Sequence, residues 1–337
     1  MNTTQKEDSA KAVNNDLSLD QAAILLSAIS YYSETGNLDS VFNDNMAPYG
    51  WEISWQPVSE YGGNYALIAN NGDQYLLAIR GSVLDFSESA LEDWFEEDFN
   101  VLAQDPWTYI ETNGSPMVSA GTSVGMNNLN NLFDFNGNSI TDFLGNLTDS
   151  DSLCVTGHSL GGGLAPIYAL YLKYWYSTYQ PTVNPAMNIV TFAGPTVSNA
   201  DFGSLFIQYF NGSYTAYVNI IDIVPMAASN IANIGNLYFG DDNSDEPRAA
   251  DIYMPSHPDI TLQAFFDAAD VAIITAQAYE ESWYTPLADG EVTQLNTDSA
   301  IISNDYTGFD AWMEQAGSQH GSNNYLQLMG LQPINLQ

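Results

Sequence analysis

The stretch at residues 153–166, LCVTGHSLGGGLAP, constrains the fold more than any other part of the sequence. An apolar, strand-like run ends at a glycine, and a helix-like run begins after a serine and three further glycines. Gly157, Ser159 and Gly161 fit the G-x-S-x-G pattern, in which a nucleophilic serine occupies a strained turn between a strand and a helix. Small residues also let a helix pack closely on a sheet, so the rest of the chain has to decide between packing and chemistry.

The pattern of apolar residues along the chain predicts an α/β fold. Helical spacing occurs at 22–31, 164–176 and 260–279, and strand-like runs occur at 153–156, 187–192, 216–221 and on both sides of Asn71-Gly72. This alternation predicts a mostly parallel central sheet with helices on both faces.

We expect a single domain over residues 1–337, because no internal repeat or low-complexity linker divides the chain. Residues 1–16 form a polar lead. A decorated C-terminal insertion is expected at 240–310, with a surface loop near 240–258 and irregular polar chain at about 282–308.

The charge balance is strongly acidic, with 41 Asp and Glu residues against 5 Lys and Arg and a formal net charge of −36. Such a surface repels nucleic acid and anionic lipid headgroups, so neither class of partner is expected. It favours solubility and suits a saline or extracellular setting, although an acidic composition shared by a whole lineage explains it equally well.

The N-terminal residues lack the apolar segment of a signal peptide, and no stretch predicts a membrane-spanning helix. We expect a secreted protein, while a cytoplasmic location stays open. Cys154 is the single cysteine, which rules out a disulfide within the chain, and its apolar neighbours predict a buried side chain. The oligomeric state is not predicted.

A serine hydroxyl needs a base to take its proton, and histidine titrates in the right range. The chain has three histidines, His158, His257 and His320. His158 directly precedes Ser159, so we expect its side chain to point away from the serine's face and to pack or hydrogen-bond beneath the turn. His257 and His320 both remain candidates for the base at this point.

Asp222 directly follows an apolar run in the stretch VNIIDIVP. An acid at the end of a strand can orient the imidazole of a base and stabilise its charged form. An ordinary turn aspartate is the alternative, and position alone does not separate the two.

Four motifs follow one another along the chain: AIRGS at 78–82, VTGHSLGGGLA at 155–165, NIIDIVP at 219–225 and HGSNNYL at 320–326. Together they resemble the class 3, fungal-type lipase family of α/β-hydrolases. The resemblance covers about 60–226 and a short C-terminal match. The long stretch between the acid and the last histidine departs from the family.

The resemblance implies an α/β-hydrolase fold with Ser159 as nucleophile, Asp222 as acid and His320 as base, in the chain order of that superfamily. The family's histidine often precedes a Tyr-Leu pair at the spacing seen after His320. His257 lacks that continuation and is the runner-up. No cofactor or metal is implied.

Ester hydrolysis also needs hydrogen-bond donors for the oxyanion. The turn offers the backbone N–H of Leu160 at the start of the predicted helix. The resemblance implies Ser82 as the second donor, in a turn with Arg80 and Gly81. A simple turn serine is the alternative for Ser82.

Arg80 ends an apolar run, which predicts a buried ion pair that steadies this turn, with Asp93 or Asp98 as partner. The segment 83–97 has apolar residues on one helical face and acids on the other, as a surface helix does. After an oxyanion residue in a lipase-like chain, we expect it to be a lid. Its apolar residues include Leu84, Phe86, Leu91, Trp94 and Phe95.

These residues predict a carboxylic ester hydrolase acting on lipids, most simply a triacylglycerol lipase with an acyl-enzyme mechanism. The acidic surface predicts a lipid ester substrate at a neutral oil–water interface. A phospholipase A1, or an esterase of the soluble-ester or feruloyl type, shares the machinery and stays open. A non-catalytic binding module on the same fold is the remote alternative.

Overall fold

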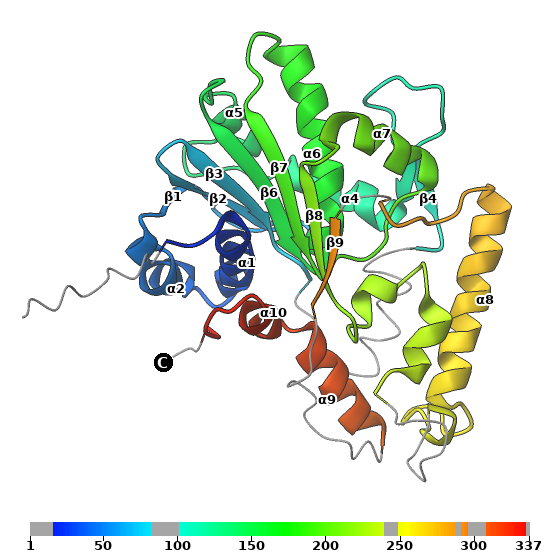
Figure 1. The fold of residues 1–337 in the computed structure, drawn as a ribbon. Helices are drawn as coiled ribbons and strands as arrows, with labels where there is room; N and C mark the ends of the chain where they lie inside the picture. The colour runs from blue at the N-terminus through cyan, green and yellow to red at the C-terminus, as the bar shows by residue number, and fades with distance from the viewer. Residues whose placement is uncertain (1–15, 83–100, 239–248, 288–290, 296–307, 335–337) are drawn as a thin grey trace, which may run out of the picture.

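The computed structural model describes residues 16–82, 101–238, 249–287, 291–295 and 308–334. Within these ranges a seven-stranded sheet has the order β1-β2-β3-β6-β7-β8-β9 (Figure 1). Its strands are β1 (Glu52–Trp55), β2 (Ala66–Asn71), β3 (Gln74–Ile79), β6 (Ser152–His158), β7 (Ala186–Phe192), β8 (Tyr214–Asn219) and β9 (Glu291–Leu295). The first three pair antiparallel and the last five run parallel, which confirms the predicted sheet.

Helices cover both faces of the sheet (Figure 1). One face packs against α1 (Leu19–Ser30), α2 (Leu38–Asn45) and α10 (Ser322–Leu328). The other packs against α4 (Ala120–Leu129), α5 (Ile140–Leu144), α6 (Leu160–Tyr179) and α7 (Ala200–Phe210). The fold is therefore three-layered, as an α/β protein with a parallel sheet requires.

A third apolar cluster lies beside the end of β8 and contains α8 (Leu262–Glu280) and α9 (Phe309–His320). Short 3₁₀ turns and a small ladder complete the described elements: η1 (Tyr31–Ser33), η2 (Ala47–Tyr49), η4 (Val224–Met226), η5 (Ile231–Asn236), η6 (Ala249–Asp251), β4 (Gln104–Pro106) and β5 (Met117–Ser119). No helix in the described ranges is both long and apolar enough to cross a bilayer.

Local sequence explains where several elements begin and end. Ser18 and Gln21 form a reciprocal capping box at the start of α1, satisfying two backbone N–H groups. Gly72 has φ +67° in the tight turn between β2 and β3, a conformation that suits glycine. Strand β6 is buried along almost its whole length because it lies centrally, with helices on both faces.

The C-terminal region differs from the sequence prediction at one element. Irregular chain was expected over about 282–308, but Glu291–Leu295 form β9, the edge strand paired with β8. The short segment EVTQL has few apolar residues, and the Val292 side chain is 52% exposed. An edge strand has only one strand partner and needs no buried faces, so its sequence carries a weak strand signal.

Candidate active site

Ser159 occupies the turn where strand β6 meets helix α6. Its backbone has φ +60° and ψ −132°, a conformation that residues other than glycine rarely adopt. The strand before it is held by parallel neighbours on both sides, so the turn cannot relax by shifting the strand. Strain of this kind is typical of a nucleophile elbow, which places the serine at the carboxyl edge of the sheet.

The glycines around Ser159 are required by close backbone contacts. A Cβ on Gly157 would overlap the backbone of Gly161, and a Cβ on Gly161 would overlap the carbonyl of Ile79 in β3. A Cβ on Gly162 would lie 2.7 Å from the Phe192 carbonyl oxygen in β7. Helix α6 therefore begins directly against two strands, and only glycine fits there.

Three side chains distant in sequence form a continuous hydrogen-bonded line. Ser159 Oγ lies 2.8 Å from His320 Nε2, and His320 Nδ1 lies 3.0 Å from Asp222 Oδ2. Their exposed fractions are 1%, 2% and 0% respectively. The structure thus brings together the residues expected as nucleophile, base and acid. Because Asp222 accepts at Nδ1–H, the Nε2 lone pair is free to accept the serine proton.

Asp222 is held by two further donors. The Val224 N–H donates to Oδ1 at 3.0 Å, and the Tyr325 hydroxyl donates to Oδ2 at 2.8 Å. Burial and the neighbouring Asp222 charge raise the pKa of Tyr325 well above its ordinary value, so this hydroxyl stays protonated and remains a donor. A carboxylate that accepts several hydrogen bonds is held in one orientation.

The base is carried by the last residue of helix α9. Just before it, Gln319 accepts two hydrogen bonds from the Asn219 amide, at its backbone oxygen (3.1 Å) and at Oε1 (2.8 Å). Asn219 is the last residue of β8, three residues before Asp222. The end of the helix is therefore tied to the strand that precedes the acid.

His158 lies beneath the turn and contacts the backbone of His320. Its Nε2 lies 2.8 Å from the His320 carbonyl oxygen, and its Nδ1 lies 2.9 Å from the Tyr31 hydroxyl. Burial, followed by the nearby His320 ring, lowers the pKa of His158 well below 6.5. His158 is therefore neutral at ordinary pH. Tyr31 belongs to the site, although sequence analysis did not identify it.

The predicted oxyanion turn lies against the nucleophile. A Cβ on Gly81 would lie 2.9 Å from Ser159 Cβ, which shows how closely the two backbones approach. Ser82 follows directly and is half-buried. On the other side, the Leu160 N–H is in the first turn of α6, where the helix provides no acceptor. Both residues expected as oxyanion donors thus lie beside Ser159.

Arg80 forms ion pairs with two glutamates that precede it in the chain. Its guanidinium lies 2.6 Å from Glu60 and 3.3 Å from Glu34, and it donates to Ser33 Oγ at 2.7 Å. Sequence analysis expected Asp93 or Asp98 instead, and these lie outside the described residues. Arg80 is 2% exposed and therefore anchors the turn internally.

Two other predictions concern residues away from this geometry. His257, the runner-up base, lies exposed in a turn where its N–H donates to Met254 and its carbonyl accepts from Ile260. His320 and not His257 is adjacent to Ser159. The predicted lid at 83–97, with all of its named apolar side chains, lies outside the described residues.

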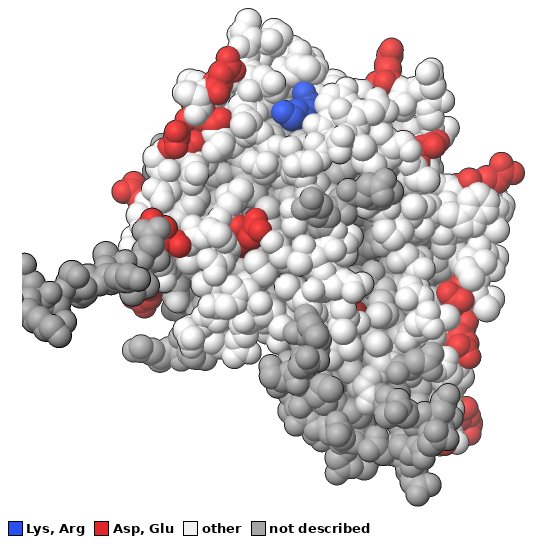
Figure 2. Space-filling view, viewed as in Figure 1, with Lys and Arg blue, Asp and Glu red and all other residues white. Residues whose placement is uncertain are grey.

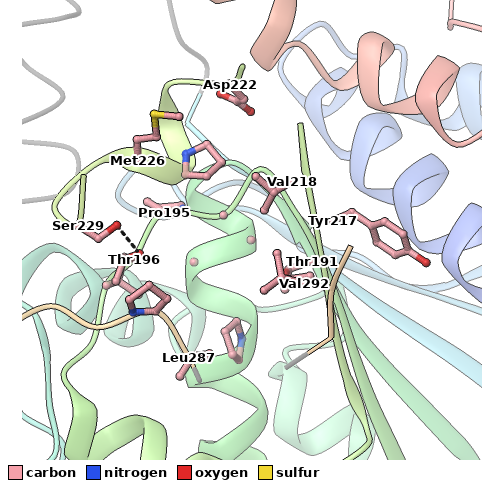
Figure 3. Close-up of a pocket in the computed structure, with 18 of the residues that line it drawn as sticks. Thr191, Pro195, Thr196, Tyr217, Val218, Asp222, Met226, Ser229, Leu287 and Val292 are labelled. Carbon is pink, nitrogen blue, oxygen red and sulfur yellow. Dashed lines mark hydrogen bonds between the residues drawn. The ribbon is translucent and has the colours of Figure 1, made fainter. Parts of the chain in front are cut away.

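A cavity of about 320 Å³ lies on the α6 side of the sheet, next to Asp222 (Figure 3). Pro195, Val218, Leu287 and Val292 line it, and a hydrogen bond between Thr196 and Ser229 lies on its wall (Figure 3). Neither Ser159 nor His320 is among the described residues that line it.

The charges of the described surface are nearly all negative. Acidic side chains are spread along the edges of the face in Figure 2, and little basic surface is visible. Among the described residues Arg80 and Lys173 are the only Lys or Arg, and Arg80 is buried. No cluster of three or more metal-ligating His, Cys, Asp or Glu side chains occurs in the part of the chain that the structure describes.

Comparison with known proteins gives one family match. A family model described as "Lipase (class 3)" matches residues 78–231, which contain the Arg80–Ser82 turn, the elbow and Asp222. His320 lies outside the matched residues. A search of curated proteins found no match.

Several solved structures are similar to this chain. The M37 lipase crystal structure matches with a TM-score of 0.71 at 24% identity, covering 94% of this chain and 93% of that one. Lipase II from Rhizopus niveus and the triacylglyceride lipase of Rhizomucor miehei each match at 19% identity over 62% of this chain and 72% of theirs, with TM-scores of 0.45 and 0.43. The likeness to M37 lipase extends over nearly the whole of both chains and shows the α/β-hydrolase fold.

Proposed function

We propose that this chain, of which residues 78–231 match a class 3 lipase family model, is a triacylglycerol lipase acting through Ser159, His320 and Asp222. The observation that carries the proposal is the hydrogen-bonded line from Ser159 Oγ through His320 to the Asp222 carboxylate, with contacts of 2.8 Å and 3.0 Å. Hydrogen-bond contacts of this length are those that proton transfer from a serine nucleophile requires.

In the acylation step, His320 Nε2 takes the hydroxyl proton while Ser159 Oγ bonds to the ester carbonyl carbon. The tetrahedral oxyanion then collapses, the ester C–O bond breaks, and the leaving alkoxide takes the proton from the imidazolium. In the deacylation step, His320 takes a proton from a water molecule while the water oxygen bonds to the acyl carbon. The second tetrahedral intermediate then collapses, Ser159 Oγ leaves and takes the proton back from the imidazolium, and the fatty acid is released. Asp222, with Tyr325 and Val224 as donors, keeps the imidazole in the required tautomer and stabilises its positive charge.

The oxyanion is assigned to two donors. The Leu160 N–H points from the positive end of α6, and the Ser82 N–H belongs to the turn packed against Ser159. Donors that are already fixed before the reaction stabilise developing charge without reorganising. The carbonyl oxygen of the substrate would bind between them.

The substrate assignment rests on charge. The described surface is acidic and almost without exposed cations, so it repels anionic headgroups and is compatible with an uncharged ester surface. This favours triacylglycerol at a neutral interface over anionic phospholipid. An extracellular location is the setting we propose on the same acidic composition.

The test compares wild type with Ser159→Ala on tributyrin, from below its solubility limit to a full emulsion. Ser177→Ala is the matched control, because Ser177 is an exposed serine on the same helix. We expect activity in wild type and the control, a rise in rate once droplets form, and no activity in Ser159→Ala. Equal activity on dissolved ester with no rise at the droplet boundary would indicate an esterase. Unchanged activity of Ser159→Ala would refute the proposed nucleophile.

The choice between triacylglycerol and phospholipid needs a second substrate. Vesicles of the anionic phospholipid phosphatidylglycerol, assayed for released fatty acid beside the tributyrin emulsion, separate the two. We expect the emulsion to be the better substrate by at least about tenfold, because an acidic surface repels the anionic headgroup. A preference for the vesicles would favour phospholipase A1.

A further inference from the structure

His158 is buried and Tyr31 is half-buried at the site, and the acyl-enzyme mechanism assigns no role to either side chain. His158 immediately precedes Ser159, while Tyr31 begins the η1 turn that follows helix α1. Their side chains meet through the 2.9 Å contact between the Tyr31 hydroxyl and His158 Nδ1. The second ring nitrogen of His158 contacts the carbonyl of His320 at 2.8 Å.

The proton on His158 can be assigned from its partners. The His320 carbonyl only accepts, so His158 Nε2 must carry the hydrogen and donate it. In the neutral ring Nδ1 is then the acceptor, and the Tyr31 hydroxyl donates to it. Burial raises the pKa of Tyr31 and lowers that of His158, so neither group changes charge near neutral pH.

The position of the His320 carbonyl explains why it needs this donor. His320 is the last residue of α9, and the last carbonyls of a helix have no N–H partner within the helix. The His158 N–H supplies one. The two imidazole rings also lie against each other, with centroids 4.8 Å apart and planes inclined by 36°.

The Tyr31 hydroxyl lies where several parts of the site meet. It also lies 3.4 Å from the His158 carbonyl oxygen. A Cβ on Gly81 would overlap it. Tyr31 therefore contacts His158 and lies against the oxyanion turn.

We propose that Tyr31 and His158 are positioning residues for the base: the Tyr31 hydroxyl fixes the tautomer of His158, and His158 holds the backbone of His320 so that its imidazole stays in line with Ser159. This proposal rests on the proposed function. Its consequence is that the residue before the nucleophile fixes the distance between nucleophile and base. The Tyr31 hydroxyl, which orients His158, comes from the η1 turn after helix α1, 127 residues away along the chain.

The test uses steady-state hydrolysis of dissolved p-nitrophenyl butyrate by the full chain. Tyr31→Phe removes one neutral hydrogen bond, and we expect kcat to fall about tenfold while KM stays within about twofold. His158→Phe removes both hydrogen bonds, and we expect a larger fall in kcat. His158→Gln keeps an N–H for the His320 carbonyl, so we expect it to recover part of that loss.

Tyr32→Phe is the matched control, because the neighbouring Tyr32 hydroxyl bonds to the Ile334 carbonyl away from the site. We expect it to leave kcat and KM unchanged. If Tyr31 acts through His158, the double variant Tyr31→Phe with His158→Phe should be no slower than His158→Phe alone. If His158→Phe does not fold, the same cycle with His158→Gln should show a smaller effect of Tyr31→Phe than in wild type.

Two results would overturn the proposal: wild-type kcat in Tyr31→Phe, or a full tenfold loss from Tyr31→Phe in the His158 variants as well. The second result would mean that Tyr31 acts directly on Ser159 or the oxyanion turn. Ser159→Ala in the same assay separates this failure from that of the proposed function. Residual activity in Ser159→Ala would refute the nucleophile, whatever the Tyr31 variants do.

Discussion

The two reacting side chains lie 2.8 Å apart, but the structure holds them in different ways. Ser159 is fixed by backbone packing, since the glycines beside it lie against the main chain of β3 and β7. His320 is fixed by side-chain hydrogen bonds, at its ring from Asp222 and at its carbonyl from His158. The position of Ser159 thus depends on the small volume of the neighbouring glycines, and the position of His320 depends on hydrogen-bond donors and acceptors.

This difference predicts which substitutions each side tolerates. A larger side chain at one of the glycines should lower the stability of the protein, while the molecules that still fold keep the catalytic groups in place. On the base side, the exchange of a donor for an acceptor should remove activity and largely preserve the fold. Measurement of stability and activity on the same variants separates the two.

The largest effect is expected for Asp222→Asn on the base side. The new amide can donate to His320 Nδ1, which moves the imidazole proton to Nε2 and removes the acceptor for the Ser159 hydroxyl. We expect kcat to fall by about 10⁴, equivalent to about 5 kcal/mol in the barrier. The melting temperature should stay close to wild type, because Asn still accepts from Val224 or Tyr325. Loss of the fold together with activity would contradict a role confined to orienting the imidazole.

Gly161→Ala should have the next largest effect, on stability. The added Cβ would overlap the Ile79 carbonyl, which cannot move because β3 is paired on both sides. We expect a loss of about 3 kcal/mol in the free energy of unfolding, measured by urea denaturation. Gly203→Ala is the control, since the nearest atom to its Cβ would be Leu287 Cδ2 at 3.9 Å. Equal stability of the two variants would mean that backbone packing does not fix the elbow.

A smaller effect is expected for Tyr325→Phe, which removes one of two non-imidazole donors to Asp222. We expect kcat to fall about tenfold, in line with the loss of one hydrogen bond to a charged group. KM should not change, because Tyr325 is fully buried and does not contact substrate. Tyr214→Phe is a suitable control: this tyrosine hydroxyl has a 3.5 Å contact with Thr191 within the fold. An equal loss of kcat in both variants would point to a general packing effect.

The nucleophile side could be predicted from sequence because its determinants are contiguous. The strand, the strained serine and the glycines that allow close packing all lie within residues 153–163. Five of the seven strands of the sheet follow from the same kind of local pattern; β1 and β9 were not predicted. The short, partly exposed strand at 291–295 takes its structure from pairing with β8, and its own residues carry little signal.

The residues that position the base could not be recognised from local sequence. His320 and Asp222 are 98 residues apart, and only the resemblance favoured His320 over His257. The partners of Arg80 were expected after it in the chain, but the described ones, Glu34 and Glu60, precede it. The chain has 21 tyrosines, and nothing in the local sequence distinguishes Tyr31, which directly follows helix α1. Its contact with His158 exists only once α1 has packed on the sheet. Side-chain hydrogen bonds between distant segments are a product of the fold, and a single sequence does not specify them.

The smallest expected effect concerns the pH dependence of stability and tests whether the fold keeps His158 neutral. The pKa of His158 in the folded protein is well below its ordinary value of 6.5, first because of burial, so the unfolded chain binds a proton that the folded chain does not. The stabilising contribution of neutral His158 is therefore fully present above about pH 6.5 and declines as pH falls toward its folded pKa. Between pH 6.5 and about 5.5 this amounts to about 1 kcal/mol. His158→Gln lacks the titrating group, so its melting temperature should fall less than that of wild type over this range. A parallel decline in the two proteins would show that His158 is not held neutral by the fold, and would remove the reason why Tyr31 can donate to it.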